Sequence, residues 1–391
     1  MTRPAGDRTY ALTACAVMFL WPVVTTDFAH VNAVAILLAL SALILGALVL
    51  LYNVSPWLVT VVAVASGIAL RLTTDAYSGS DVANATAEAL RAIATGTSPY
   101  HHVYSTTNPP GQPFPYLPGE LWLYDIQQRI FGSLQDHDRW WSVGALLGVA
   151  ALVPVCGARA ILATALLAVS STNILIGVDG SNDTGLLFLL VTAVLALAYA
   201  SRAVRGQKVW LAAALYALSA ALFGWALAFK ALVWIAFPFV VRAIAPQRRW
   251  AYILGAVGVA LAFSVPFAIG APADFFHSIG SGFTSHDNVW GFNVWAALDA
   301  SHPAVMTALL NYTVPVAIFA TLFTAMTLWT RKPATLGEAL LQSCIVLAAM
   351  LLFARWTSLA YYAFLIGTFA LAIATFGFEP EPSQAAGAVN R

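Results

Sequence analysis

Charged residues are scarce in this sequence, and their scarcity excludes several classes of protein. Only 9% of the 391 residues are Asp, Glu, Lys or Arg, whereas soluble domains usually carry about 25%. So few charges cannot cover a water-soluble globule, and disordered chains are charge-rich, so both classes are excluded. The 18 basic and 17 acidic residues give a net charge of +1, which argues against nucleic acid as a partner.

Cysteines and the common nucleotide and hydrolase motifs are also lacking. Cys15, Cys156 and Cys344 all fall in apolar runs, and an odd number of such thiols gives no disulfide framework. The sequence has no Walker A motif, no dinucleotide-binding G-x-G-x-x-G, no H-E-x-x-H and no G-x-S-x-G. Nucleotide-driven transport and serine or zinc hydrolysis therefore find no support.

Hydrophobic residues make up 60% of the chain, and the mean hydropathy is +0.80. A helix that crosses a bilayer needs about 20 apolar residues. The first apolar stretch contains Pro22 and no small-residue cleavage site follows it, so we expect it to be retained rather than removed as a signal peptide. The sequence predicts an all-α polytopic membrane protein of about 12 transmembrane helices. They are expected at roughly 10–27, 31–52, 56–73, 139–156, 159–178, 184–201, 209–228, 231–245, 250–271, 303–330, 337–354 and 357–377.

The basic and acidic residues are distributed unequally between the two sides of the membrane. With the N-terminus in the cytoplasm, the inner segments hold 12 basic and four acidic residues, which is the positive-inside pattern. The outer side receives the other 6 basic and 13 acidic residues, with long loops at 74–138 and 272–302. We therefore expect one transmembrane domain over residues 1–378, a cytoplasmic polar tail at 379–391 and the functional groups on the outer face. The inner basic residues are Arg3, Arg8, Arg159, Arg202, Arg205, Lys208, Arg242, Arg248, Arg249, Arg331, Lys332 and Arg391.

The first outer loop has a recognisable organisation. Residues 82–95 have a modest apolar stripe, which predicts a helix resting on the membrane surface, and a second interfacial helix is expected at 119–131. A proline-rich extended segment joins the two. Asp81 stands at the start of the first helix, where it can cap the helix, act as a base at the membrane boundary, or do both.

This loop resembles the GT-C superfamily of membrane glycosyltransferases, most closely glycosyltransferase family 87 and the polyprenyl-phosphate-mannose-dependent mannosyltransferases. The resemblance covers about 40 residues and departs at Tyr116-Leu117-Pro118, where the family has an aromatic-Pro-Pro. It implies that Asp81 is the catalytic base, that the donor is a polyprenyl-phosphate sugar, and that no metal or other cofactor takes part. The matching residues are Asp81, Gly96, Ser98, Pro99, Tyr100, Pro115, Tyr116 and Pro118.

A short outer turn, VDGSNDTG, carries Asp179, Asn182 and Asp183. One interpretation is a turn followed by a helix cap. A similar turn in the resembling families gives Asp179 and Asp183 a possible part in acceptor binding. The two carboxylates can also be read as a metal pair, but no His or Glu completes a ligand spacing, so no metal is expected.

Three cations interrupt apolar stretches or end them. Lys230 divides two predicted spans, Arg355 lies between the last two, and Arg71 ends the third. Each can be an interfacial anchor or a phosphate contact. A lysine at the end of a comparable span recurs in the resembling family, which favours Lys230 as a phosphate ligand. Arg355 is a second candidate, because an arginine can hold a phosphate bidentately, and Arg71 is less favoured.

The second outer loop contains HSIGSGFTSHDNVWGFNVW, which suggests a mobile loop over the site. His286 and Asp287 are candidate substrate contacts there, although a lone loop histidine is more often structural. His101 and His102, next to Tyr100, are weaker candidates.

The leading hypothesis is an inverting glycosyltransferase of a bacterial cell membrane, with its active site on the extracytoplasmic face. It would move mannose or arabinofuranose from a polyprenyl-phosphate donor to a glycolipid or polysaccharide hydroxyl. The alternatives are a multi-span transporter or lipid flippase, and a structural assembly protein. Transporters usually place their polar sites at mid-membrane, often in paired repeats, and neither feature is visible.

Overall fold

The computed structural model describes residues 5–25, 33–52, 55–75, 80–107, 110–131, 137–284 and 289–378. Within these residues the chain is all-α apart from one pair of two-residue strands, in agreement with the predicted class. His286, Asp287 and the tail at 379–391 lie outside the described residues.

The elements follow one another in this order. The first part of the chain forms α1 (Ala5–Thr25), α2 (Ala33–Tyr52), α3 (Pro56–Thr73), α4 (Val82–Ala94), α5 (Pro118–Phe131), α6 (His137–Ala150), α7 (Val153–Cys156), α8 (Ala158–Val169), α9 (Ser171–Ile176) and α10 (Asp183–Arg205). The second part forms α11 (Val209–Phe229), α12 (Leu232–Ala243), α13 (Pro246–Gly270), α14 (Pro272–Thr284), β1 (Trp290–Gly291), α15 (Val294–Ser301), α16 (Pro303–Leu309), the 3₁₀ helix η2 (Leu310–Tyr312), α17 (Thr313–Trp329), α18 (Leu336–Phe353), β2 (Trp356–Thr357) and α19 (Leu359–Thr375).

Six helical segments in the described residues are long and apolar enough to cross a membrane. They are Asp138–Cys156, Asp183–Arg205, Val209–Phe229, Pro246–Gly270, Pro303–Trp329 and Leu336–Phe353. Shorter apolar helices lie in the other six predicted ranges, at Thr9–Leu20, Leu40–Val49, Trp57–Thr73, Ala158–Val169, Leu232–Ala243 and Leu359–Thr375. The protein is therefore a helical chain compatible with several membrane passages, and the count of twelve stays a prediction.

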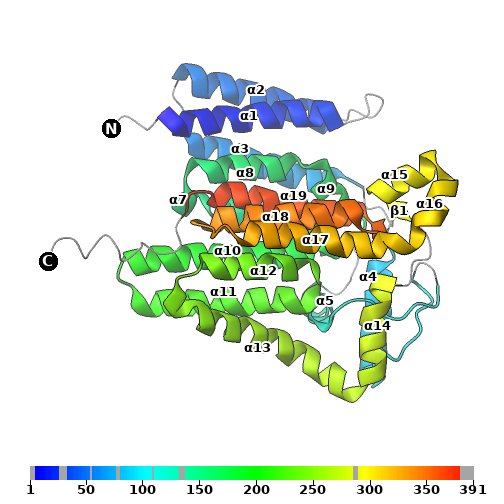
Figure 1. The fold of residues 1–391 in the computed structure, drawn as a ribbon. Coiled ribbons are helices and arrows are strands. Elements are labelled where there is room, and N and C mark those ends of the chain that lie inside the picture. Colours follow the sequence, from blue (N-terminus) through cyan, green and yellow to red (C-terminus); the bar gives the residue numbers. More distant parts are fainter. Residues whose placement is uncertain are drawn as a thin grey trace.

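The long helices lie side by side, and the connecting elements separate to two ends of the bundle (Figure 1). Helices α4, α5, α14, α15 and α16 gather at one end. At the other end, Arg159 of α8 donates to the Tyr10 hydroxyl of α1 at 3.3 Å and to the carbonyl of Phe376, just after α19. The two helices expected at 82–95 and 119–131 are present as α4 and α5, at the end away from Arg159.

Helices α13 and α17 expose large apolar side chains, as membrane-facing helices do. Leu254 and Ile269 of α13 and Phe319 and Met326 of α17 are each more than 60% exposed. Close packing occurs on the inner side of α13, where a Cβ on Gly224 of α11 would lie 2.2 Å from the Ala256 carbonyl oxygen. A small residue is needed at such a crossing.

Most of the described part of the range 272–302 is regular structure rather than the expected loop, namely α14, the two residues of β1 and α15, and mobility over the site stays a prediction. Helix α14 covers Pro272–Thr284 because Phe275 and Ile279, four residues apart, both pack against the cluster around Tyr100. Strand β1 then pairs in parallel with β2. Gly291 has φ +100 and approaches Thr357 so closely that a Cβ would meet its carbonyl oxygen at 1.6 Å, which explains a glycine at this position.

We expect the 202–208 connection to face the cytoplasm, because the basic excess lies on that side. In a background with Cys15, Cys156 and Cys344 replaced by alanine, Gln207→Cys should react with a membrane-impermeant maleimide only after the cells are opened. Gln207 is exposed in the α10–α11 connection. A failure to label intact cells will therefore reflect the side of the membrane on which Gln207 lies, and not burial of the side chain. Labelling of Gln207→Cys in intact cells would show that this connection faces outward and that the expected orientation is wrong.

Candidate active site

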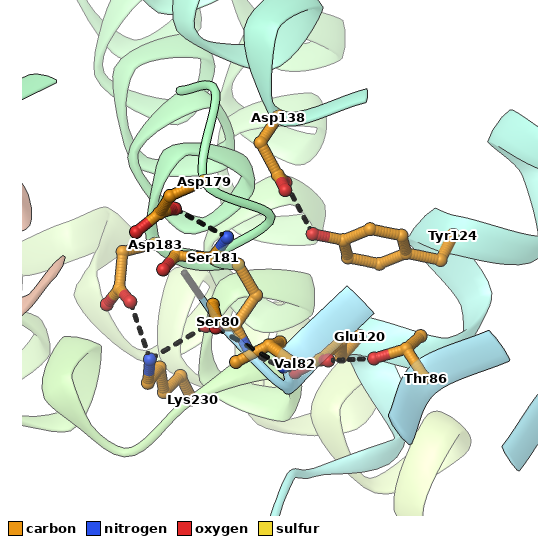
Figure 2. A network of polar contacts seen from close by, with 11 residues as sticks. Ser80, Val82, Thr86, Glu120, Tyr124, Asp138, Asp179, Ser181, Asp183 and Lys230 are labelled. Atoms are coloured by element: carbon orange, nitrogen blue, oxygen red, sulfur yellow. Dashed lines mark hydrogen bonds and ion pairs between the residues drawn. The ribbon is translucent and has the colours of Figure 1, made fainter. Parts of the chain in front are cut away.

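Polar side chains are concentrated where the N-terminal end of α10 meets α4, α5 and the break between α11 and α12 (Figure 2). Asp183 and Lys230 face one another there, and Glu120 lies beside Thr86. This end of α10 is next to the turn that carries Asp179, and the backbone N–H of Ser80 donates to the Asp179 carbonyl at 3.2 Å. The start of the first outer loop is thereby joined to the 177–183 turn.

Lys230 occupies the break between two helices. Its backbone is extended (φ −156, ψ 141), so α11 ends at Phe229 and α12 begins at Leu232. The ammonium Nζ donates to Asn182 Oδ1 and to Asp183 Oδ2, both at 2.8 Å. The lysine side chain is only 12% exposed and the aspartate 2%, so this is a buried ion pair. The structure thus pairs two residues that the sequence nominated separately.

The Asn182 amide links Lys230 to a glutamate that the sequence analysis missed. An ammonium only donates, so the amide oxygen of Asn182 must face Lys230 and the amide nitrogen must face away. That nitrogen donates to Glu120 Oε2, and Thr86 Oγ1 hydrogen-bonds Glu120 Oε1 at 2.7 Å. A continuous chain of contacts therefore runs from α4 through α5 and the N-cap of α10 to Lys230.

Glu120 is fully buried at the start of α5. Burial raises the pKa of its carboxyl to about 8, and the hydrogen bonds from Thr86 and Asn182 and the nearby Lys230 ammonium offset this only in part. At pH 7 the protonated, neutral form is therefore the main one. The positive charge of Lys230 is then balanced by Asp183 alone, because Glu120 adds no second negative charge.

The two predicted aspartates of the 177–183 turn have different surroundings. Asp179 Oδ1 accepts from the backbone N–H of Ser181 at 2.8 Å, which is the expected turn interaction. Burial raises the pKa of Asp179 to about 6 despite this hydrogen bond. Asp183 Oδ2 accepts a hydrogen bond from Lys230. The buried Oδ1 of Asp183 has no hydrogen-bond partner among the described residues.

Asp81 holds the N-cap position of α4, and its carbonyl accepts from Ala85 N at 2.9 Å. Its side chain makes no capping hydrogen bond; the nearest capping oxygen is Ser80 Oγ, 3.2 Å from Val82 N. Asp81 therefore occupies the predicted N-cap position of α4, but its side chain does not make the predicted capping hydrogen bond. The carboxylate is half-buried rather than enclosed.

Two tyrosines connect Asp81 with Lys230. The Asp81 carboxylate lies near enough to Tyr116 and Tyr361 to act electrostatically on both hydroxyl groups. The Lys230 ammonium lies 5.7 Å from the centre of the Tyr116 ring and 4.8 Å from that of Tyr361. Asp81 and Lys230 therefore both interact with the same aromatic pair, and both rings can stabilise the cation.

Tyr100 has a packing role in the described structure. It is 2% exposed, its hydroxyl donates to the Tyr116 carbonyl at 2.9 Å, and its ring meets Phe275 of α14 edge-on with centroids 4.8 Å apart. Tyr100 thus supports the segment that carries Tyr116 and joins it to α14. Substrate contact by Tyr100 stays a prediction.

The two arginines considered as phosphate ligands, Arg355 and Arg71, make hydrogen bonds to residues outside the group around Lys230. Arg355, directly before β2, donates to Thr313 Oγ1 and to the Leu310 carbonyl, both at 2.9 Å, and so contacts α17 and η2. Arg71 is fully buried and bonds Ser142 Oγ at 2.7 Å, together with carbonyls of α3 and α8. Arg71 therefore holds helices together, in keeping with its lower rank as a ligand.

The remaining predicted candidates are histidines of the outer loops. His101 Nδ1 lies 2.7 Å from Asp274 Oδ2 of α14, and His102 Nε2 lies 2.9 Å from Glu88 Oε1 of α4. These pairs tie the 96–116 segment to its neighbouring helices. In the part of the chain that the structure describes, no three His, Cys, Asp or Glu residues come together as a metal site would require.

No model of a known protein family matches the sequence, and no curated protein is significantly similar to it. Function is therefore inferred from the geometry of the site and from the resemblance of the first outer loop.

Proposed function

We propose that the protein is an inverting membrane glycosyltransferase that moves a sugar from a polyprenyl-phosphate donor to an acceptor hydroxyl. The observation that carries the proposal is that the Asp81 carboxylate and the Lys230 ammonium both interact with Tyr116 and Tyr361. A half-buried carboxylate and a buried cation near one aromatic pair supply the two charges that glycosyl transfer needs. The aromatic rings beside these charges offer a surface on which a sugar can rest.

In the proposed reaction, Asp81 accepts the proton of the acceptor hydroxyl as its oxygen attacks the anomeric carbon. The new bond joins that oxygen to the anomeric carbon, and the bond from the anomeric carbon to the phosphate oxygen breaks. The polyprenyl phosphate leaves with the bonding electron pair, so it gains negative charge. Lys230 stabilises this charge most in the transition state because it is already in place.

The polar site lies at one end of the bundle, next to α4 and α5, and this supports an enzyme working at a membrane surface. We propose the extracytoplasmic face, because the basic segments belong to the opposite end. A bundle of twelve spans with the GT-C arrangement and a single domain over 1–378 belongs to the same proposal. Mannose and arabinofuranose are the sugars to test first, on resemblance alone.

Reconstitution provides the direct test. Purified protein in proteoliposomes should transfer radiolabelled sugar from one member of a panel of polyprenyl-phosphate sugars to a glycolipid or polysaccharide acceptor. Saturable movement of the donor across the bilayer without transfer would instead identify a flippase. Absence of transfer from the whole panel, with donor bound, would remove the proposal.

Arg355 stays a predicted donor contact, and its role can be measured separately. Because its guanidinium already donates to η2 and α17, we expect Arg355→Gln to raise the donor KM by less than about tenfold. The larger effect should be a lower melting temperature, since losing hydrogen bonds from a charged group typically costs about 1.5–3 kcal/mol. A rise in KM without a change in melting temperature would instead place Arg355 at the phosphate.

A further inference from the structure

Glu120 has a place in the site that the proposed reaction does not use. Its side chain is fully buried, and its two oxygens meet one group from α4 and one from the N-cap of α10. The Asn182 amide that bonds Glu120 also accepts from the Lys230 ammonium. Any change in the charge of Glu120 therefore reaches Lys230 through a single intervening side chain.

We propose that Glu120 is a positioning residue whose protonation controls whether Lys230 can bind an anion: neutral Glu120 permits anion binding, and ionised Glu120 opposes it. The proposal rests on the proposed function in one respect, namely that the anion is the phosphate of a lipid-linked donor. The control itself follows from the contacts among Glu120, Asn182 and Lys230.

The number of charges around Lys230 explains why ionisation of Glu120 weakens anion binding. Lys230 already has one carboxylate partner, because Asp183 Oδ2 lies 2.8 Å from its ammonium. With Glu120 neutral, the ammonium faces one negative charge, and an arriving phosphate meets a pair with no net charge. With Glu120 ionised, two carboxylates surround one ammonium, and the phosphate is repelled in a poorly solvated site where charges interact strongly. Anion binding must then weaken.

The hydrogen bonds around Glu120 can persist in both protonation states. The Asn182 amide can donate only toward Glu120, because its oxygen is held by Lys230. The Thr86 hydroxyl can either donate to a carboxylate or accept from a carboxylic acid. The network can therefore change charge without losing its partners.

Other titratable groups face Glu120 from the elements around it. Tyrosine side chains are neutral below about pH 10. The Asp183 carboxylate is paired with the Lys230 ammonium. Helix α11 instead presents Trp225, whose Nε1 donates to the Gly119 carbonyl at 2.8 Å. Asp138 is the other carboxyl to control for, and it accepts from Tyr124 at 2.5 Å. The facing groups are Lys230, Asp183, Asp138, Tyr100, Tyr116 and Tyr124.

The direction of the pH effect follows from the raised pKa. Burial moves the pKa of Glu120 to about 8, so the neutral form predominates below pH 8 and the ionised form above it. Anion affinity should be high and constant below this pH and should fall as the pH rises through it. The fall should approach tenfold per pH unit, as expected when one proton must be bound for the ligand to bind.

The test measures binding of farnesyl phosphate to the full-length protein in nanodiscs, with farnesol as the uncharged control. Above about pH 7 the probe keeps its charge, since the second pKa of a phosphate ester is about 6. Between about pH 7 and pH 9.5 the wild-type affinity should fall, and Glu120→Gln, which has nearly the same shape and stays neutral, should remove the fall. Asp138→Asn should keep the wild-type profile, and farnesol binding should not vary with pH.

A second variant keeps the test decisive if Glu120→Gln fails to fold. The hydrogen bond from Thr86 lowers the pKa of Glu120, so Thr86→Val should move the midpoint of the affinity profile to higher pH. An unchanged midpoint in Thr86→Val, or the same fall in wild type and Glu120→Gln, would overturn the control by Glu120. Absence of farnesyl phosphate binding at every pH would overturn it as well.

The outcome is separable from that of the proposed function. If farnesyl phosphate binding follows Glu120 but no polyprenyl-phosphate sugar is used, the inference stands and the glycosyltransferase proposal fails. If sugar transfer occurs with a donor KM that does not vary with pH, the proposed function stands and the inference fails.

Discussion

Asp81→Asn should leave a stable protein that binds donor but transfers sugar about 100- to 10,000-fold more slowly, the usual cost of losing a general base. Asparagine has the same shape but does not take up the proton of the acceptor hydroxyl. Folding should be unaffected, because the Asp81 side chain makes no capping hydrogen bond and asparagine serves at an N-cap about as well as aspartate. The measurement is kcat at saturating donor, with the melting temperature and donor Kd recorded for the same sample.

Asp75 provides the matched control. It is an exposed carboxylate just after α3, six residues before Asp81. Asp75→Asn should keep turnover within about twofold of wild type, because exposed positions away from the site rarely matter. If Asp75→Asn abolished turnover while Asp81→Asn did not, the alignment to the resembling family would be wrong by one acidic residue. Full activity in both would move the search for the base to Asp179 and Asp183.

Much of the helical organisation was readable from the sequence because it depends on local composition. Each predicted range contains an apolar helix, of which six are long enough within the described residues to cross a membrane, and the break at Lys230 falls where the sequence places it. Helix α4 begins one residue after Asp81, as its apolar stripe predicts. These features need only the apolar length of a stretch and the residues that end it.

The contacts that build the site were not readable, because they join residues far apart in the chain. Lys230 bonds Asp183 across 47 positions, and Glu120 bonds Asn182 across 62. Glu120 in the first turn of a short helix is an ordinary arrangement, since acidic residues are favoured there. Only its complete burial distinguishes it, and burial follows from how α5 packs against α4 and α11.

Lys230→Met is the second change expected to have a large effect, and it should act on both folding and donor use. Removing the ammonium leaves the Asp183 carboxylate buried and without its counter-charge. Breaking one partner of a buried ion pair typically costs about 3–5 kcal/mol of stability. We therefore expect a strongly lowered melting temperature in detergent, together with loss of donor use, so this variant alone cannot separate structure from function.

The double variant Lys230→Met, Asp183→Asn separates the two effects. With both charges gone, no buried carboxylate at position 183 lacks a partner, so most of the lost melting temperature should return. Donor use should stay about 10- to 150-fold below wild type, because a charge-assisted phosphate contact is typically worth about 1.5–3 kcal/mol. Lys208→Met, which removes an exposed lysine from the α10–α11 connection, should change neither quantity.

The comparison of these three proteins decides what Lys230 does. If the double variant regains both its melting temperature and its donor KM, Lys230 serves only to neutralise Asp183, and the phosphate must be bound elsewhere, with Arg355 examined next. If it regains stability while the donor KM stays high, the ammonium acts on the donor directly. The second result is expected, because the Lys230 ammonium lies near the rings of the two tyrosines on which the Asp81 carboxylate also acts.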